Sequence, residues 1–228
     1  MRVLIIQNCA PEGLGLYEDY LKENKIEHQV FHAYTGKRFP SQKQFDAFII
    51  GGTPLSVREI RRYPFMMNER KYIKKAIAAN NPVFGICGGG QLVASALGAR
   101  VRKNPVMEIG GCQVKLTSDG KKSRFFRGFP SKFEVFHWHG DTFDIPESGK
   151  RLAESADCQN QAFAVGKAIG VQFHIEVTAK TASRWSDEYP GELKIVKKSK
   201  SRVVRECRAR EAGMKKLVYQ LMNNWLGR

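Results

Sequence analysis

The sequence predicts an α/β protein, a three-layer sandwich in which helices cover both faces of a mostly parallel sheet. Two observations lead to this prediction. In the first hundred residues, short apolar runs alternate with segments whose apolar residues recur at helical spacing, the order typical of strands joined by helical crossovers. The apolar runs are also continuous rather than interrupted by polar residues, as expected of strands that are buried on both faces.

The first half of the chain is expected to supply the parallel strands and the helices that connect them. Within residues 65–81, Tyr72, Ile73, Ala76 and Ile77 fall on one helical stripe, which predicts a helix with one buried face. The other segments alternate in the same way. The expected strands are 2–7, 27–33, 45–52 and 82–87, and the expected helices are 12–24, 65–81 and about 90–98.

After residue 100 the pattern changes to short strands joined by turns, and after Glu176 the strand signals end. The short strands predict an antiparallel extension of the sheet, followed by helices. The complete prediction is a flavodoxin-like sandwich over residues 1–180, with a basic helical C-terminal extension, 181–228, packed on the same domain. The expected extended segments are 108–117, 132–141, 161–166 and 168–176, with turns at 118–122 and 145–150.

Composition indicates one substantial core in a reducing compartment. A chain of 228 residues can bury such a core. Five cysteines without a CxxC pair form neither a disulfide framework nor a zinc-finger pattern, so we expect a cytoplasmic protein. The N-terminus has only four consecutive apolar residues, too few for a signal peptide. The uncharged stretch 76–99 contains Pro82 and five glycines, which favour a buried strand and helix over a membrane span.

Half of the net charge of +16 lies in one C-terminal segment. Between Lys194 and Lys216, ten lysines and arginines stand against two glutamates, a net charge of +8. Two interpretations stay open: a solvated helical face, or a docking face for an acidic partner. Because the chain lacks RNP-like and zinc-finger motifs, a nucleic-acid partner is not expected.

The stretch PVFGICGGGQLVASALGA (82–99) joins a short apolar strand to an Ala/Leu-rich helix through Cys87 and three glycines. Such a joint is typical of a nucleophile elbow, in which small neighbours leave room for an exposed nucleophile. A thiol at a helix N-terminus is also stabilised as thiolate, and the free N–H groups there can bind an oxyanion. On this segment alone, a structural cysteine in a glycine-rich turn remains an alternative.

A cysteine nucleophile needs a base and a group that orients the base. The segment GVQFHIEVT offers both, because His174 and Glu176 are two residues apart in a stretch expected to be extended. Residues i and i+2 of a strand point to the same face, so the carboxylate can fix the imidazole tautomer and stabilise the imidazolium. The alternative is a polar pair on a solvated strand face.

Four motifs in the same order resemble those of the class I, triad-type glutamine amidotransferases, over about residues 1–180. GICGGGQ (85–91) is similar to the GxCxGxQ nucleophile motif of that family, and GVQFHIEVT is similar to its QFHPE motif. IIGGTPLSV (49–57) resembles the GGPxS loop that precedes the elbow. WHGD (138–141) resembles a segment beside the glutamine pocket and is best matched in the glutaminase domain of GMP synthases.

The resemblance implies that Cys87 attacks the side-chain amide of glutamine to give a γ-glutamyl thioester and ammonia. His174 would serve as general base and then general acid, with Glu176 orienting it. The resemblance also implies an oxyanion hole made of the backbone N–H groups of Gly88, Gly51 and Gly52, and substrate contacts from Gln91 and from the segment with His139, Gly140 and Asp141. Apart from the resemblance, Asp141 and Gln161 are candidates for lining the glutamine pocket, with ordinary turn capping as the alternative.

Three positions depart from the family motifs. The GGP of the loop is GGTP here, with Thr53 before the proline, and Ile175 replaces the proline of QFHPE. Gly88 stands where relatives often carry a larger residue. None of these departures removes a catalytic group, but the first leaves open which loop amide faces the oxyanion.

His137 and His139 form an HxH pair that could bind a metal, since alternating strand positions share a face. No third ligand is evident, so neither a metal nor another cofactor is expected. The other cysteines have no partner motif and are expected to be packing residues: Cys9, Cys112, Cys158 and Cys207.

The chain carries no P-loop, GxGxxG or other ATP signature, so we expect it to supply ammonia from glutamine to a separate synthetase. A stand-alone γ-glutamyl peptidase or hydrolase is an enzymatic alternative. A non-catalytic regulatory protein on the same scaffold is the alternative from another class. The presence of Cys87, His174 and Glu176 together favours an enzyme.

Overall fold

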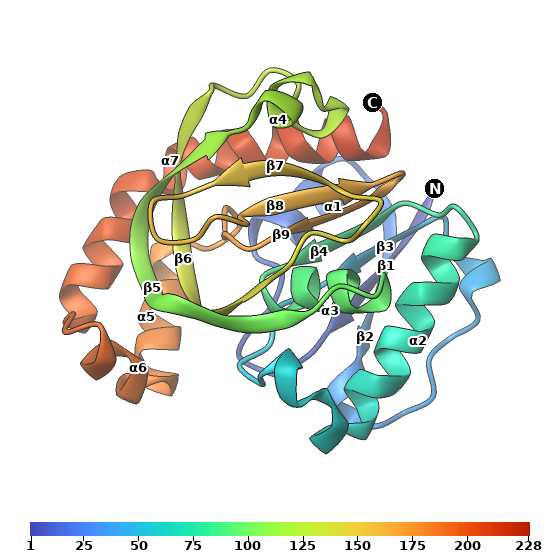
Figure 1. The fold of residues 1–228 in the computed structure, drawn as a ribbon, viewed down its shortest axis with the longest axis horizontal. Coiled ribbons are helices and arrows are strands. Elements are labelled where there is room, and N and C mark those ends of the chain that lie inside the picture. The colour runs from blue at the N-terminus through green and yellow to red at the C-terminus, as the bar shows by residue number, and fades with distance from the viewer.

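The computed structural model describes residues 1–228 and contains nine strands in one sheet. The strands are β1 (Arg2–Gln7), β2 (Glu27–His32), β3 (Ala47–Ile50), β4 (Val83–Ile86), β5 (Val101–Leu116), β6 (Lys132–Phe143), β7 (Lys150–Glu154), β8 (Ala162–Val165) and β9 (Ala168–Val171). Their order is β2-β1-β3-β4-β9-β8-β7-β5-β6, drawn in Figure 1. The five strands from β2 to β9 are parallel, and the pairings from β9 onward to β6 are antiparallel. The predicted parallel sheet with an antiparallel extension is therefore confirmed.

Helices cover both faces of this sheet. They are α1 (Leu16–Glu23), α2 (Pro64–Ala78), α3 (Gly88–Ala96), α4 (Ser118–Lys122), α5 (Ala179–Glu188), α6 (Pro190–Ile195) and α7 (Lys200–Leu226). The apolar residues of α1, α5 and α7 join one buried cluster with one face of the sheet. Those of α2 and α3 join a second cluster on the other face. The three-layer α/β sandwich is confirmed.

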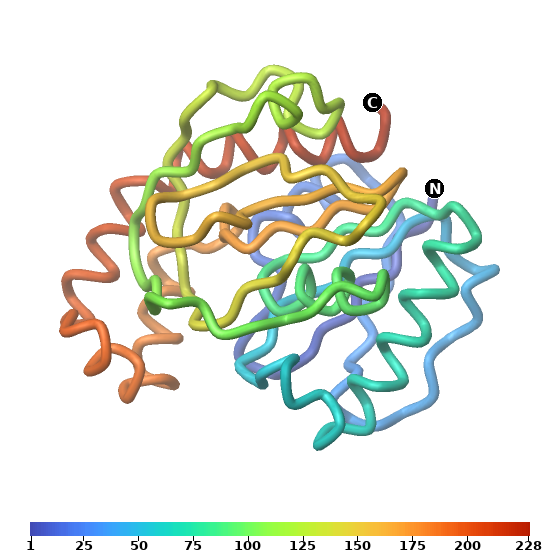
Figure 2. The backbone as a smooth tube through the Cα atoms, in the orientation of Figure 1, coloured from blue at the N-terminus to red at the C-terminus, as the bar shows by residue number.

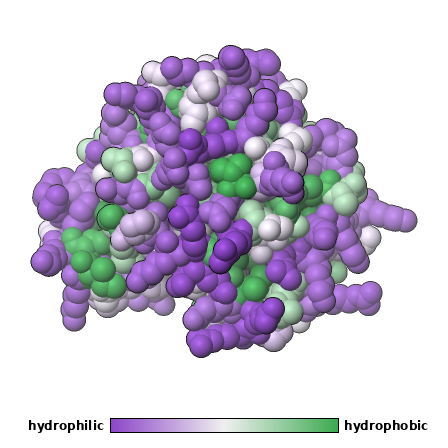
Figure 3. All heavy atoms as spheres, viewed as in Figure 1, coloured by the Kyte–Doolittle hydropathy of each residue, from purple (hydrophilic) through white to green (hydrophobic).

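The two cores leave few large apolar side chains at the surface. Of these, Met1, Tyr34, Val106 and Ile195 are exposed. The face of the molecule in Figure 3 is mostly hydrophilic, with small groups of apolar side chains between hydrophilic ones. No helix has both the length and the apolar character that crossing a membrane requires.

The C-terminal helix α7 is part of the main core. Its buried face contributes Val203, Cys207, Met214, Val218 and, near its end, Trp225, whose ring lies 5.8 Å from that of Phe84 in β4. Burial of such a face, at about 25 cal/mol per Å², holds a helix in place far more strongly than its own propensity. Figure 2 shows this last segment running behind the sheet. A domain boundary at residue 180 stays a prediction.

The antiparallel half differs in detail from the sequence-based expectation. β5 begins at Val101 rather than at residue 108, and β7 was not expected at all. β9 ends at Val171 instead of continuing to Glu176. Residues 118–122 form the short helix α4, because the Thr117 side chain accepts a hydrogen bond from the Gly120 amide and so caps it.

Candidate active site

Cys87 lies at the joint between β4 and α3, where it is the N-cap residue of the helix. Its backbone has φ 50° and ψ −113°, a region that a residue with a side chain rarely adopts. The surrounding hydrogen bonds fix this conformation, since the Cys87 amide donates to the Val171 carbonyl at 2.8 Å. The side chain faces a cavity of about 390 Å³. This geometry is that of a nucleophile elbow.

The glycines after Cys87 allow close packing of the elbow against the loop that follows β3. A Cβ on Gly89 would lie 2.1 Å from the Ile50 carbonyl oxygen, a distance that no side chain tolerates. A Cβ on Gly88 would lie 2.7 Å from Cγ2 and 2.9 Å from the backbone nitrogen of Thr53. The space that a side chain at position 88 would need is thus filled by Thr53. Two of the departures from the family motifs are coupled in space.

This coupling predicts that Gly88→Ala lowers kcat by about 10²-fold for the glutamine hydrolysis that the sequence motifs lead us to expect, because the added methyl displaces the loop or the elbow by a fraction of an ångström. Thr53→Ser removes the threonine methyl group and keeps the Oγ1 that accepts from the Leu55 amide. The double variant is therefore expected to regain part of the lost kcat. Steady-state kinetics checks this, with Gly191→Ala as a control because nothing lies within 4 Å of that position. Equal losses in the single and double variants would contradict the coupling.

His174 and Glu176 form a buried pair next to the elbow. The imidazole Nδ1 lies 2.6 Å from Oε1 of Glu176, and the Ile175 amide donates to the other carboxylate oxygen at 3.0 Å. Burial lowers the pKa of His174, but its interactions with Glu176 and with Cys87 outweigh burial and raise this pKa well above its usual value. The imidazolium form is therefore stabilised by a carboxylate on one side and the cysteine on the other.

His174 and Glu176 do not lie in a strand, contrary to the sequence-based prediction. Because β9 ends at Val171, His174 and Glu176 lie in the segment that follows it. Reciprocal hydrogen bonds between His174 and Phe136 of β6, at 2.8 and 2.9 Å, hold this segment against the antiparallel part of the sheet. The indole of Trp185 packs edge-on against the imidazole, with centroids 5.1 Å apart.

The cavity brings together most of the residues expected at the site. Cys87, Gln91, His139, Gly140, Asp141 and His174 all line it, whereas Glu176 lies behind His174. The side-chain amide of Gln91 donates to the backbone carbonyl oxygen of Asp141 and to Gln172 Oε1, both at 3.2 Å. Gln161 does not line the cavity, and its amide instead donates to Glu108.

The loop after β3 limits which amides can serve an oxyanion. The Gly51 amide donates to the Ile6 carbonyl at 2.8 Å, so the sheet already uses it. The backbone amides of Gly52, Thr53 and Gly88, in contrast, donate to no backbone carbonyl in the turns and loops of the chain. The expectation that included Gly51 is therefore corrected: the amides left available beside Cys87 are those of Gly52, Thr53 and Gly88.

Sequence reasoning missed several side chains that contact Cys87 or line the cavity. The side-chain amide of Gln172 donates to Cys87 Sγ at 3.4 Å. Gln172 stands in the same motif as His174 but was not among the expected site residues. Arg58 pairs with Asp141 at 2.9 Å, and the Ser56 hydroxyl donates to the same carboxylate at 2.5 Å. Position within a motif could have indicated Gln172. Nothing in the sequence links residues 56–58 to Asp141, because 85 positions separate Ser56 from it.

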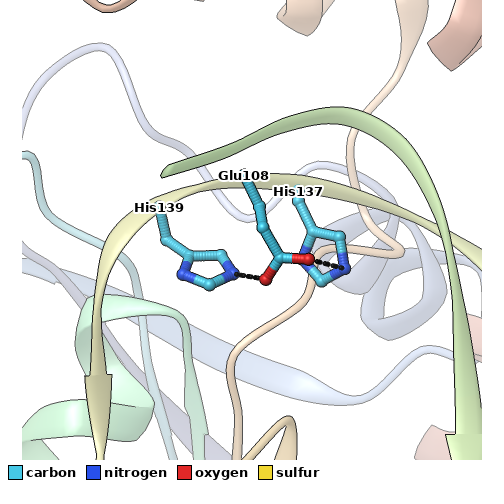
Figure 4. Close-up of side chains that lie close together, drawn as sticks. All are labelled: Glu108, His137 and His139. Carbon is cyan, nitrogen blue, oxygen red and sulfur yellow. Dashed lines mark ion pairs between the residues drawn. The ribbon is translucent and has the colours of Figure 1, made fainter. Parts of the chain in front are cut away.

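Glu108 supplies a third polar group beside His137 and His139, which the sequence did not reveal. The three potential ligand atoms lie within 4.8 Å of one another. Figure 4 shows the Glu108 carboxylate between the two rings, 2.9 Å from His139 Nε2 and 3.9 Å from His137 Nε2. Burial lowers the pKa of His137 to about 3, so this imidazole is neutral. Two histidines and a carboxylate are a ligand set that a zinc ion accepts.

Hydrogen bonds of Glu108 hold part of the cluster in place, whereas both ring nitrogens of the buried His137 have no hydrogen-bond partner. The Glu108 carboxylate accepts from Gln161 at 3.1 Å and from Ser155 at 3.2 Å, besides its contact with His139. Burial raises the Glu108 pKa, but these contacts outweigh burial and lower it. The carboxylate thereby joins β5 to β6 and to the segment before β8. That no metal binds there stays a prediction.

The fold and this arrangement of groups define a class of protein. The family model for glutamine amidotransferase class-I matches residues 15–185. The chain therefore belongs to the class I glutamine amidotransferase family, as the sequence motifs predicted.

Two curated relatives and one solved structure show how far the similarity extends. The glutamine amidotransferase-like protein YfeJ of Salmonella typhimurium is 32% identical over 185 residues, 79% of this chain and 77% of that protein. One of the subunits of the glutamine-hydrolyzing GMP synthase of Saccharolobus solfataricus is 37% identical over 139 residues, 59% of this chain and 69% of that relative. The crystal structure of a glutamine amidotransferase from Thermotoga maritima has a TM-score of 0.92 and 34% identity, and the match covers 100% of this chain and 99% of that one. The chain spans 33% of the length of two full-length GMP synthases that it matches.

Proposed function

We propose that the protein hydrolyses the side-chain amide of glutamine through a γ-glutamyl thioester on Cys87. The observation that carries this proposal is the position of His174, whose imidazole interacts with Glu176 on one side and Cys87 on the other at the edge of the cavity. A thiol on a strained elbow, an imidazole base and a carboxylate are the three groups that acyl transfer requires.

The proposed reaction has two steps. The Cys87 sulfur attacks the amide carbon, and His174 takes the thiol proton and transfers it to the departing nitrogen, so that ammonia and the thioester form. His174, now neutral, removes a proton from water, the hydroxide adds to the thioester carbon, and glutamate leaves as the thiol is restored. Glu176 holds the imidazole and stabilises its charged form. The amides of Gly88 and of the Gly52–Thr53 loop would bind the oxyanion in both steps.

We further propose that the ammonia passes to a separate synthetase. Similarity to the Saccharolobus solfataricus relative supports this, because that relative is named as one of the subunits of a larger enzyme, a GMP synthase. Charge gives weaker support. Five of the ten basic residues between Lys194 and Lys216 already pair with carboxylates of the chain, and the remaining five are available to an acidic partner: Lys194, Lys197, Arg205, Arg208 and Lys216.

A stand-alone hydrolase of glutamine or of larger γ-glutamyl compounds is the second candidate. It is favoured by the match to YfeJ, which extends over more than three quarters of both chains. The reducing, cytoplasmic setting inferred from the cysteines suits either candidate, since both need a free thiol.

Ammonia release from glutamine by the purified protein tests the proposal. We expect turnover and a covalent adduct at Cys87 with an electrophilic glutamine analogue, located by mass spectrometry. Turnover that rises at least about tenfold when a synthetase and its acceptor substrate are added supports ammonia transfer, whereas full turnover by the protein alone supports the hydrolase. A protein that shows neither turnover nor an adduct would refute both candidates.

A further inference from the structure

Three carboxyl groups line the same cavity as Cys87 and His174, those of Glu12, Asp141 and Glu192, and Glu12 differs from the other two in its surroundings. It lies in the loop between β1 and α1 and is 9% exposed. The hydroxyl of Tyr189, which follows α5, donates to Glu12 Oε1 at 3.1 Å. No lysine or arginine pairs with this carboxyl, in contrast to Asp141 at the other side of the cavity, which is paired with Arg58.

The other oxygen of Glu12 points toward the elbow. A Cβ on Gly52 would lie 2.8 Å from Glu12 Oε2 and 3.8 Å from the Cβ of Cys87. Oε2 therefore occupies the space beside Gly52 that the missing side chain leaves open, next to the amides available for an oxyanion. Glu12, Gly52 and Cys87 converge on one end of the cavity.

The surroundings of Glu12 favour its neutral form. Burial raises the Glu12 pKa to about 7, and the negative charge of Glu176 acts in the same direction. His174, the Tyr189 hydroxyl and the Cys9 side chain oppose this effect but are outweighed. These four groups and the Cys87 thiol, which lies at the same end of the cavity, are the titratable neighbours of the carboxyl. With a pKa of about 7, Glu12 carries its proton in about half of the molecules at pH 7 and in most of them at lower pH.

We propose that Glu12 is a further catalytic residue of the glutaminase and acts as a neutral carboxylic acid that donates a hydrogen bond from Oε2 to the carbonyl oxygen under attack. The hydrogen bond from Tyr189 to Oε1 makes that oxygen the acceptor and leaves the proton on Oε2. The proton remains on Glu12 throughout, so no bond to it forms or breaks. Donation strengthens as negative charge develops on the substrate oxygen, which is the requirement for transition-state stabilisation. This inference rests on the proposed function.

The donor role makes a prediction about pH that a purely structural role does not. Loss of the proton would place a negative charge beside the oxyanion, so kcat is expected to fall by about tenfold per pH unit above the Glu12 pKa of about 7. Glu12→Gln keeps a neutral N–H donor of similar size. It is expected to retain kcat within about threefold near neutral pH and to lose the decline above it. Glu12→Ala, which lacks a donor, should lose about 10²-fold in kcat with a small change in KM.

Glutamine turnover across pH, with Glu188→Gln as the control, is the measurement. Glu188 is an exposed carboxyl next to Tyr189, so its removal changes charge without touching the cavity. A pH profile of Glu12→Gln that coincides with that of the wild type would overturn the inference. A second result would also overturn the inference: the kcat of the wild type declines below about pH 7, Glu12→Gln removes this decline, and Glu12→Asp retains it. That result indicates that position 12 acts as an ionised carboxylate. A wild type without turnover or adduct defeats the proposed function itself and is thereby distinguished from both results.

Discussion

Cys87→Ser is expected to reduce glutamine hydrolysis by about 10⁴-fold or more in kcat, the largest effect of any single substitution in the chain. A serine hydroxyl at this position fits the elbow but remains protonated, whereas a thiol beside the raised-pKa imidazole of His174 can transfer its proton. Ammonia release measures the loss. Mass spectrometry after treatment with an electrophilic glutamine analogue should show no adduct in the variant.

The control for this prediction is Cys112→Ser. Cys112 is a half-buried thiol in β5, and burial raises its pKa to about 11, so it is a poor nucleophile at neutral pH. This variant should keep both wild-type turnover and the adduct. Activity that survives in Cys87→Ser, or a label on Cys9, Cys112, Cys158 or Cys207, would contradict the assignment of the nucleophile.

The elbow could be predicted from sequence because its cause is local. A continuous apolar run, a cysteine and three glycines specify a buried strand, a sharp turn and a helix start within about ten residues. The parallel half of the fold could be predicted for the same reason, since the strands 2–7 and 82–87 are short and each contains a continuous apolar run. The structure places β1 and β4 at these positions.

The groups around Cys87 and along the cavity are placed by long-range contacts that no local pattern contains. Glu12 faces Cys87 across 75 positions of chain, and Glu108 reaches His139 from a different strand. The early end of β9 has the same origin. After Val171 the chain pairs with β6 through Phe136 instead of with β4 or β8, a competition between strands that periodicity cannot rank.

The C-terminal extension proves to have two functions in the structure. Its long helix α7 completes the core, and the segment before it supplies part of the cavity wall through Trp185, Tyr189 and Glu192. Glu192 accepts a 2.5 Å hydrogen bond from the indole of Trp138, whose own carbonyl oxygen lies 3.7 Å from Cys87 Sγ. Composition alone described this region as basic and helical. Its contribution to the cavity depends on where the folded chain places this segment beside the sheet, which composition does not show.

Glu176→Gln is expected to lower kcat by about 10³-fold with little change in KM, the second largest effect. The substitution preserves the size of the side chain and an acceptor for the Ile175 amide, which now donates to Oε2 at 3.0 Å. It removes the negative charge that lies 2.6 Å from His174 Nδ1. Because that charge helps to hold the His174 pKa well above its usual value, the pKa should fall in the variant. NMR titration of the imidazole measures this shift, and steady-state kinetics measures kcat.

Glu211→Gln distinguishes the loss of this particular charge from the loss of another, half-buried carboxylate of the chain. Glu211 accepts a hydrogen bond from the Ala179 amide at 2.9 Å but has no contact with the imidazole. We expect that variant to keep the wild-type kcat and the raised His174 pKa. An unchanged pKa in Glu176→Gln, together with near-normal kcat, would mean that Glu176 only packs behind the base. The reaction would then rest on Cys87 and His174 as a dyad, with the imidazolium stabilised chiefly by the thiolate that it faces.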